Sequence, residues 1–122
     1  MIQLAKEKTH EVNFRTPTYI GSLRKVGKYA KALNVKVTEQ LESCNEASAE
    51  LVTALKEVAS QSDVLRLEAN TYVASRDGDH YLYYTHGADA VKNAREQRVD
   101  ALADSYSEIL REYQDICKQY DI

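Results

Sequence analysis

Histidine and carboxylate side chains gather in one short stretch of the chain, where a metal site is conceivable. The stretch holds two histidines, His80 and His86, and three carboxylates, Asp77, Asp79 and Asp89. Two histidines six residues apart do not share a helix face, because residues on one face are three or four apart. Asp77 and Asp79 also lack the further oxygen ligands of a calcium loop. The sequence therefore predicts no metal site and no cofactor.

The two cysteines, Cys44 and Cys117, are the other candidates for chemistry. A thiol nucleophile needs a base beside it, and no histidine stands at a spacing that indicates such a pair. Both cysteines fall in or beside apolar stripes, where cysteine packs as a small hydrophobic residue. No glycine-rich phosphate loop or nucleophile elbow is present either. We therefore expect no catalytic residues, and a protein that is not an enzyme.

A basic cluster is the remaining candidate site. Its four members are Arg24, Lys25, Lys28 and Lys31, and three of them recur at i, i+4 and i+7 on one helix face. Residues 1–36 carry a net charge of +6, whereas residues 37–75 carry −5 and residues 76–122 carry −4. Such asymmetry indicates a charged partner.

Two interpretations of the cluster remain open. It binds an acidic membrane surface or an acidic protein, or it docks on the acidic helical region 39–68 of its own chain or of a second subunit. Seven acidic residues follow it directly between residues 37 and 75, which favours the docking interpretation slightly. Nucleic acid is disfavoured, because the acidic remainder of the chain would repel its phosphates.

Two heptad stripes dominate the sequence and predict paired helices. The first stripe runs through Leu41, Cys44, Ser48, Leu51, Leu55, Val58, Ser62, Leu65, Ala69 and Tyr72. The second runs through Val99, Leu102, Tyr106, Ile109, Tyr113, Ile116 and Tyr120. Apolar neighbours broaden both stripes at Val52, Ala59, Val73, Leu110 and Cys117. A stripe wider than a simple seam favours a bundle of three or more helices.

The stripes and the turn signals together predict an all-α fold in a single domain, 1–122. We expect a lead-in over 1–15, then a shorter helix from Thr16 (N-cap) and Pro17 to about Leu33. Either Asn34 breaks this helix, or Val35 and Val37 carry it through with a kink. Two long helices should follow as an antiparallel hairpin, over 38–75 with Thr38 as cap and over about 80–119. They are joined by the turn at 76–79, with Asp79 capping the second helix and Gly87 bending it. A β-hairpin over 71–85 is the alternative at that turn. Self-association should complete the bundle.

Two segments of the chain resemble helices of the BAR-domain superfamily. The stretch Ser22-Leu-Arg-Lys-Val-Gly-Lys-Tyr-Ala-Lys-Ala-Leu33, followed by Leu51-Val-Thr-Ala-Leu-Lys-Glu-Val-Ala59, looks like the opening of the inverse-BAR branch. Tyr81-Leu-Tyr-Tyr84 and Ala90-Val-Lys-Asn-Ala-Arg-Glu-Gln-Arg98 are similar to the helix of sorting-nexin BAR regions. The resemblance implies a dimeric, curved helical bundle that binds acidic membranes through basic faces.

These observations lead to one functional expectation and one alternative. We expect a non-enzymatic helical-bundle scaffold or interaction module, BAR-like and membrane-associated, that forms a homo-oligomer. The alternative is a coiled-coil structural or assembly subunit without lipid contact, as in a tethering complex or a viral structure. No apolar run reaches the roughly 18 residues of a transmembrane helix, and the first residues lack the apolar core of a secretory signal. We therefore expect a cytoplasmic protein that associates peripherally with membranes.

Overall fold

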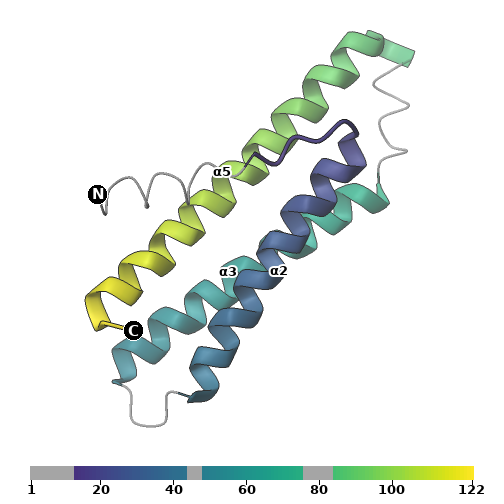
Figure 1. Cartoon of the computed structure of the whole chain (residues 1–122). Helices are drawn as coiled ribbons and strands as arrows, with labels where there is room; N and C mark the ends of the chain where they lie inside the picture. The colour runs from purple at the N-terminus through teal and green to yellow at the C-terminus, as the bar shows by residue number, and fades with distance from the viewer. Residues whose placement is uncertain (1–12, 44–47, 76–83) are drawn as a thin grey trace.

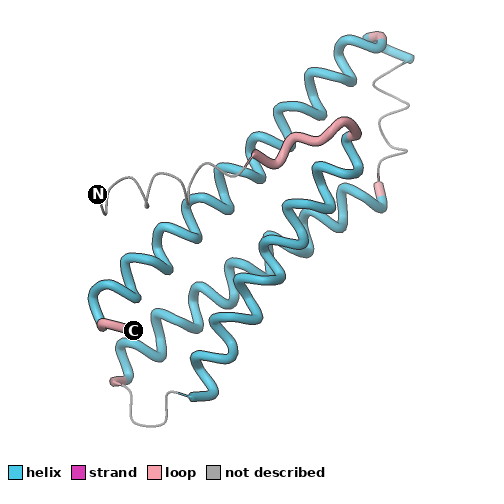
Figure 2. The backbone as a smooth tube through the Cα atoms, in the orientation of Figure 1, coloured by secondary structure: helices cyan, strands magenta, loops and turns pink. Residues whose placement is uncertain are grey.

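The protein is a bundle of long helices, as a computed structural model shows for residues 13–43, 48–75 and 84–122 (Figure 1). Its elements are α2 (Tyr19–Ser43), α3 (Ala49–Ala74) and α5 (Ala88–Tyr120). Within these described ranges the backbone forms helices, turns and loops but no strand (Figure 2). The prediction of an all-α helical bundle is confirmed. The predicted lead-in lies largely outside the described residues.

Helix α2 is longer than predicted at its C-terminal end. It begins at Tyr19, where the Gly21 N–H donates to Thr18 Oγ1 at 3.0 Å, so Thr18 and not Thr16 stands at its start. Of the two alternatives at Asn34, the break is wrong and the helix continues through Val35 and Val37. The Asn34 side-chain Nδ2 donates to the Ala59 carbonyl oxygen of α3 at 2.7 Å. Three residues further on, Val37 is fully buried. Contacts with α3 therefore carry α2 through a residue that locally favours a turn.

Helix α3 begins ten residues later than predicted. Ser48 is its N-cap, and its Oγ accepts a hydrogen bond from the Leu51 N–H at 3.1 Å. The expected cap, Thr38, lies inside α2 and is exposed. Ser48 was predicted as a seam residue, but it is exposed at the helix start. Cys44 lies outside the described residues.

The predicted apolar stripes form the core. Helices α2 and α3 pack as an antiparallel hairpin, and α5 lies against both of them (Figure 1). Six seam residues of α3 are buried, namely Leu51, Leu55, Val58, Ser62, Leu65 and Ala69. The α5 stripe is buried at Val99, Leu102, Tyr106, Ile109, Tyr113 and Ile116. The apolar side of α2 meets them with Leu23, Val26, Ala30, Leu33 and Val37.

The N-terminal part of α5 departs from this packing. Gly87, at φ 88°, precedes α5 and separates it from a helical turn at 84–86, so the predicted bend at Gly87 is a break. No residue between Ala88 and Arg98 is fully buried. Figure 1 shows these turns reaching past the ends of α2 and α3. Residues 71–73 lie in α3, which excludes the β-hairpin alternative there; the turn at 76–79, including Asp79, lies outside the described residues.

Candidate functional site

The predicted basic residues form an exposed face along α2. Arg24, Lys28 and Lys31 are exposed, and their spacing places them on one side of the helix. Lys25 differs from them, because its Nζ donates to the Asn13 carbonyl oxygen at 2.5 Å. We call Arg24, Lys28 and Lys31 the basic face of α2. Over the described chain, no carboxylate lies within ion-pairing distance of these three side chains.

The sequence around the basic face reinforces its charge. Residues 13–38 hold six Lys or Arg and no Asp or Glu. Ser22 and Tyr29, seven residues apart on another side of α2, face α5, where the Tyr29 and Tyr106 rings lie 5.8 Å apart. The basic face therefore looks away from α5. Val35, one turn after Lys31, adds an apolar side chain that is 44% exposed.

A second group of cations lies at the opposite side of α2, against the first turns of α5. The Arg95 guanidinium stacks 4.7 Å from the centre of the Tyr19 ring. Arg98 lies 4.7 Å from the Tyr72 ring, and its Nη1 donates to Tyr19 Oη at 2.5 Å. Cation–π contacts of this kind contribute about 0.5–1 kcal/mol each at exposed sites. Arg98 of α5 thus joins the start of α2 to the end of α3.

Residues 13–16 hold this end of the bundle together. Phe14 is only 2% exposed and meets the edges of Tyr29 and Tyr106 at centroid distances of 5.2 and 5.3 Å. The neighbouring Arg15 makes a two-pronged ion pair with Asp100, at 2.7 Å from Nη2 and 3.2 Å from Nε. The hydrogen bond from Arg15 to the Asp100 carboxylate raises the pKa of the guanidinium. The buried Phe14 ring and the Arg15–Asp100 ion pair thus hold this segment between α2 and α5.

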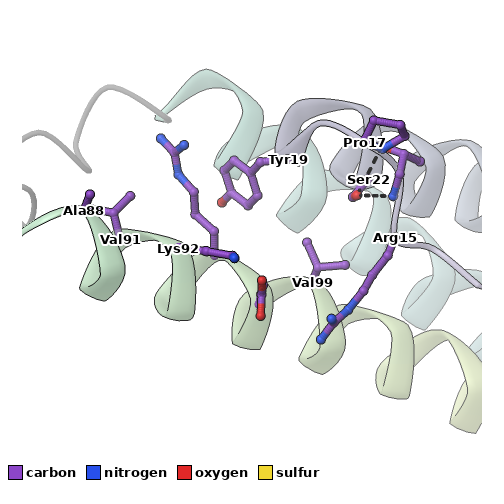
Figure 3. A pocket seen from close by; sticks show the side chains of 11 residues that line it. Arg15, Pro17, Tyr19, Ser22, Ala88, Val91, Lys92 and Val99 are labelled. Atoms are coloured by element: carbon purple, nitrogen blue, oxygen red, sulfur yellow. Dashed lines mark hydrogen bonds between the residues drawn. The ribbon is translucent and has the colours of Figure 1, made fainter.

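A cavity of about 370 Å³ opens between this segment and the first turns of α5. Figure 3 shows Tyr19 reaching from α2 toward α5, with Val91, Lys92 and Val99 on the facing helix. Three cations and one carboxylate line it: Arg15, Lys92, Arg95 and Glu96. Ser22 is not free to serve a ligand, because its Oγ accepts from the Thr16 N–H at 2.8 Å.

An acidic groove follows the junction of α3 and α5. Three hollows lie along it, each lined by small side chains such as Ala54, Ala101 and Ser105, and two of the hollows share Glu68 and Ser105. Four carboxylates and one guanidinium line it, namely Glu50, Glu57, Glu68, Glu112 and Arg98. On its rim Val64 is 61% exposed. The groove is therefore opposite in charge to the basic face of α2.

Sequence reasoning found the basic face but missed the cations of the cavity. Lys92 and Arg95 stand seven residues before Val99 and Leu102, so the second stripe predicts that they share the inner face of α5. This heptad equivalence is the signal that could have found them. No sequence signal places Arg15 beside Asp100, because 85 residues separate the two.

The other candidates for chemistry stay apart. His86 and Asp89 are exposed, and His80 lies outside the described residues. No cluster of three metal-binding side chains occurs in the described ranges. Of the helices that the structure describes, none has the length and apolar character needed to cross a membrane. Cys117 is a half-buried free thiol beside Tyr113.

Searches against protein-family models, curated proteins and solved structures found no match for this chain. The functional inference therefore depends on the charged surfaces and the cavity described above.

Proposed function

We propose that this protein is a non-enzymatic helical-bundle scaffold that binds an anionic membrane surface through the basic face of α2. The observation that carries the proposal is the exposure of Arg24, Lys28 and Lys31 without carboxylate partners in the described chain. Exposed cations on a rigid helix keep their charge available for a partner, whereas cations that stabilise the fold would be paired.

The physics of membrane adsorption favours this partner. A Lys or Arg near an anionic bilayer contributes about 1 kcal/mol, so three of them contribute about 3 kcal/mol per chain. The face has one exposed aliphatic residue, Val35, and no aromatic one, which favours adsorption at the headgroups over insertion. A second copy would double the contact and strengthen binding by avidity. The resemblance to BAR domains supports both the basic helical surface and the dimer.

A charge reversal with a matched control tests the proposal. Lys28→Glu/Lys31→Glu should abolish co-sedimentation with phosphatidylcholine vesicles that contain phosphatidylserine. Lys56→Glu/Lys118→Glu changes the net charge equally at exposed positions of α3 and α5 and should retain binding. The bound fraction should also fall with added salt, because screening confines surface charges to about 8–10 Å.

Two results would reject membrane binding. The first is a parent protein that does not sediment with anionic vesicles. The second is an equal loss of vesicle binding in both double variants. Circular dichroism should show unchanged helicity in both variants, since all four lysines are exposed.

The acidic groove favours a second candidate function, that of an assembly subunit. The basic face of one copy is opposite in charge to the carboxylates of Glu50, Glu57 and Glu68 on another, so the two surfaces attract each other. Pairing a face with a different surface of the next copy is a head-to-tail contact, which forms rings or open filaments. The same lysines would then serve subunit docking and not lipid.

A charge swap separates this candidate from membrane binding. Lys28→Glu/Lys31→Glu should dissociate any assembly seen by analytical ultracentrifugation. Mixing that variant with Glu57→Lys/Glu68→Lys should restore association between the two variants, because the charges are exchanged across the contact. A monomeric parent protein at tens of micromolar would reject the assembly function.

A further inference from the structure

The inner face of α5 changes character along its length. From Val99 onward this face is apolar and buried, but one heptad earlier it carries Lys92, which is exposed, and Arg95, which is half-buried. In a bundle, cations on an inward face are expected to meet carboxylates from the facing helix. Here the facing segment contributes Tyr19, Pro17 and Arg15, and no carboxylate. The change therefore produces a cavity with excess positive charge.

The charge of the cavity is not cancelled by its own lining. Three cations line it, and Glu96 is the one carboxylate among the lining residues. Asp100 does not line the cavity, but it neutralises part of the Arg15 charge through their ion pair. The Lys92 ammonium has no hydrogen-bond or ion-pair partner within the described ranges. An anion in the cavity would therefore meet an available donor at Lys92 and a second cation at Arg95.

The remaining walls are apolar. Pro17, Ala88, Val91 and Val99 contribute aliphatic surface. Tyr19 presents its ring to the cavity (Figure 3). The Arg95 guanidinium is stacked 4.7 Å from the centre of that ring, so the apolar and cationic parts of the cavity adjoin each other. A volume of about 370 Å³ falls in the range of small-ligand sites, which are mostly apolar with a few placed polar groups.

We propose that this cavity binds an organic phosphate, with the phosphate between Lys92 and Arg95 and the organic part against Val91 and Val99. A phosphate monoester carries nearly two negative charges at neutral pH, opposite in sign to a lining in which three cations outnumber one carboxylate. Guanidinium groups suit phosphate because they donate parallel hydrogen bonds. Arg15, held by Asp100, contributes charge from the rim.

The site is distinct from the basic face of α2. It lies between α2 and α5, whereas Arg24, Lys28 and Lys31 look away from α5. Two sources could supply the same chemistry, namely the headgroup of a phosphatidic-acid-type lipid and a soluble phosphate monoester.

Isothermal titration calorimetry on the full chain tests the proposal with four probes. The probes are dihexanoyl phosphatidic acid, phenyl phosphate, inorganic phosphate and dihexanoyl phosphatidylcholine. We expect saturable binding of at least one of the first two, and binding of the last two that is weaker by about tenfold or more. Tighter binding of the phosphatidic acid would identify a lipid source, and tighter binding of phenyl phosphate a soluble one.

Substitutions on α5 locate the site. Lys92→Glu should weaken binding of the organic phosphate by about tenfold or more, the loss expected for one charge-assisted hydrogen bond. Lys118→Glu makes the same charge change on the same helix, away from the cavity, and should leave the affinity unchanged. Lys92→Gln, which removes the charge without adding a carboxylate, should give an intermediate loss.

The proposal is overturned if neither organic phosphate binds saturably, or if Lys92→Glu and Lys118→Glu bind alike. Inorganic phosphate that binds as tightly as the organic probes would overturn the role of the apolar walls. The Lys28→Glu/Lys31→Glu variant separates this site from the membrane proposal, because it should lose vesicle binding and keep its affinity for phenyl phosphate.

Discussion

Two glycines of α2 show how the space around one residue decides what it tolerates. A Cβ at Gly21 would lie 2.6 Å from Thr16 Oγ1 and 2.7 Å from Thr18 Oγ1. A Cβ at Gly27 would meet Asn70 Oδ1 at 3.5 Å and the Ala69 Cβ at 3.8 Å, which are ordinary contacts. Both positions lie in a helix, where alanine is favoured over glycine. The surroundings accommodate a Cβ at Gly27, whereas at Gly21 a Cβ would clash with two threonine hydroxyls.

We predict opposite changes in stability at these positions. Gly27→Ala should raise the free energy of unfolding by up to about 1 kcal/mol, because alanine favours the helix. Gly21→Ala should lower it, because the two threonine hydroxyls that organise the start of α2 must move. Urea denaturation followed by circular dichroism measures both. A stabilised Gly21→Ala variant would contradict this account of the helix start.

Two buried tyrosines give the protein a dependence on alkaline pH. Burial, followed by the neighbouring Tyr29, raises the pKa of Tyr106 above its ordinary value of 10.0. Burial, followed by the Cys117 thiol, raises the pKa of Tyr113, whose hydroxyl donates to Gln40 Oε1. The folded chain therefore keeps both protons to higher pH than the unfolded chain.

The sign of the pH effect follows from these shifts. Below about pH 10 both states are protonated, so this contribution to stability is complete, and it is lost as pH rises through the folded-state pKa values. Ultraviolet difference titration should show that Tyr106 and Tyr113 ionise above the ordinary tyrosine pKa of 10.0. Tyr113→Phe should remove one late step and reduce the alkaline loss of stability. A titration above pH 10 that Tyr113→Phe leaves unchanged would contradict this account of Tyr113.

At the scale of elements, the periodic segments were predictable and their junctions were not. The run from Leu51 to Ala69 repeats at heptad spacing, and its buried side agrees with the structure. The predicted boundary between α2 and α3 was wrong because Asn34 and Thr38 carry local signals for a helix break. Those signals are outweighed by contacts far away in sequence, namely the bond from Asn34 to Ala59 and the burial of Val37.

The same limit applies to the candidate sites. The basic face of α2 follows from spacing within one helix, so the sequence was enough to find Arg24, Lys28 and Lys31. The cavity depends on how α5 meets residues 13–22, which one helix's periodicity cannot supply. Arg15 enters it through its pairing with Asp100.

The start of α3 gives a prediction at the scale of elements. Ser48 accepts from the Leu51 N–H and satisfies one of the donors at the helix start. Ser48→Ala should therefore lower the free energy of unfolding by about 1 kcal/mol. Thr38→Ala is the control, because Thr38 is exposed within α2 and caps nothing there. Equal losses in urea melts, or a larger loss at Thr38, would mean that α3 begins where the sequence first indicated.

At the scale of the whole molecule, α5 is joined to the hairpin differently along its length. Its C-terminal two thirds pack into the core through the second stripe. Its first turns instead meet the segment 13–22 across the cavity and the Arg98 contacts. A helical bundle of this form has a shared core and one end where few side chains hold α5, so a ligand bound at that end would fix the direction of α5.

The final prediction concerns the residue that joins these parts. Phe14 is nearly fully buried and touches both α2 and α5 through Tyr29 and Tyr106. Phe14→Ala should cost about 3–5 kcal/mol, the usual loss for a buried aromatic ring. Because domains of this size have about 5–15 kcal/mol of total stability, the variant should melt at much lower urea concentration.

The adjacent residue provides the control for Phe14. The Arg15–Asp100 pair is about half exposed, and exposed ion pairs contribute little to stability, so Arg15→Ala should leave the urea midpoint nearly unchanged. Amide hydrogen exchange of the Phe14→Ala variant should then show whether the substitution destabilises α5 alone or all three helices. Faster exchange confined to α5 would mean that Phe14 holds α5 on an independently stable hairpin. Equal acceleration in α2, α3 and α5 is the result we expect, because the three helices share one core and should unfold together.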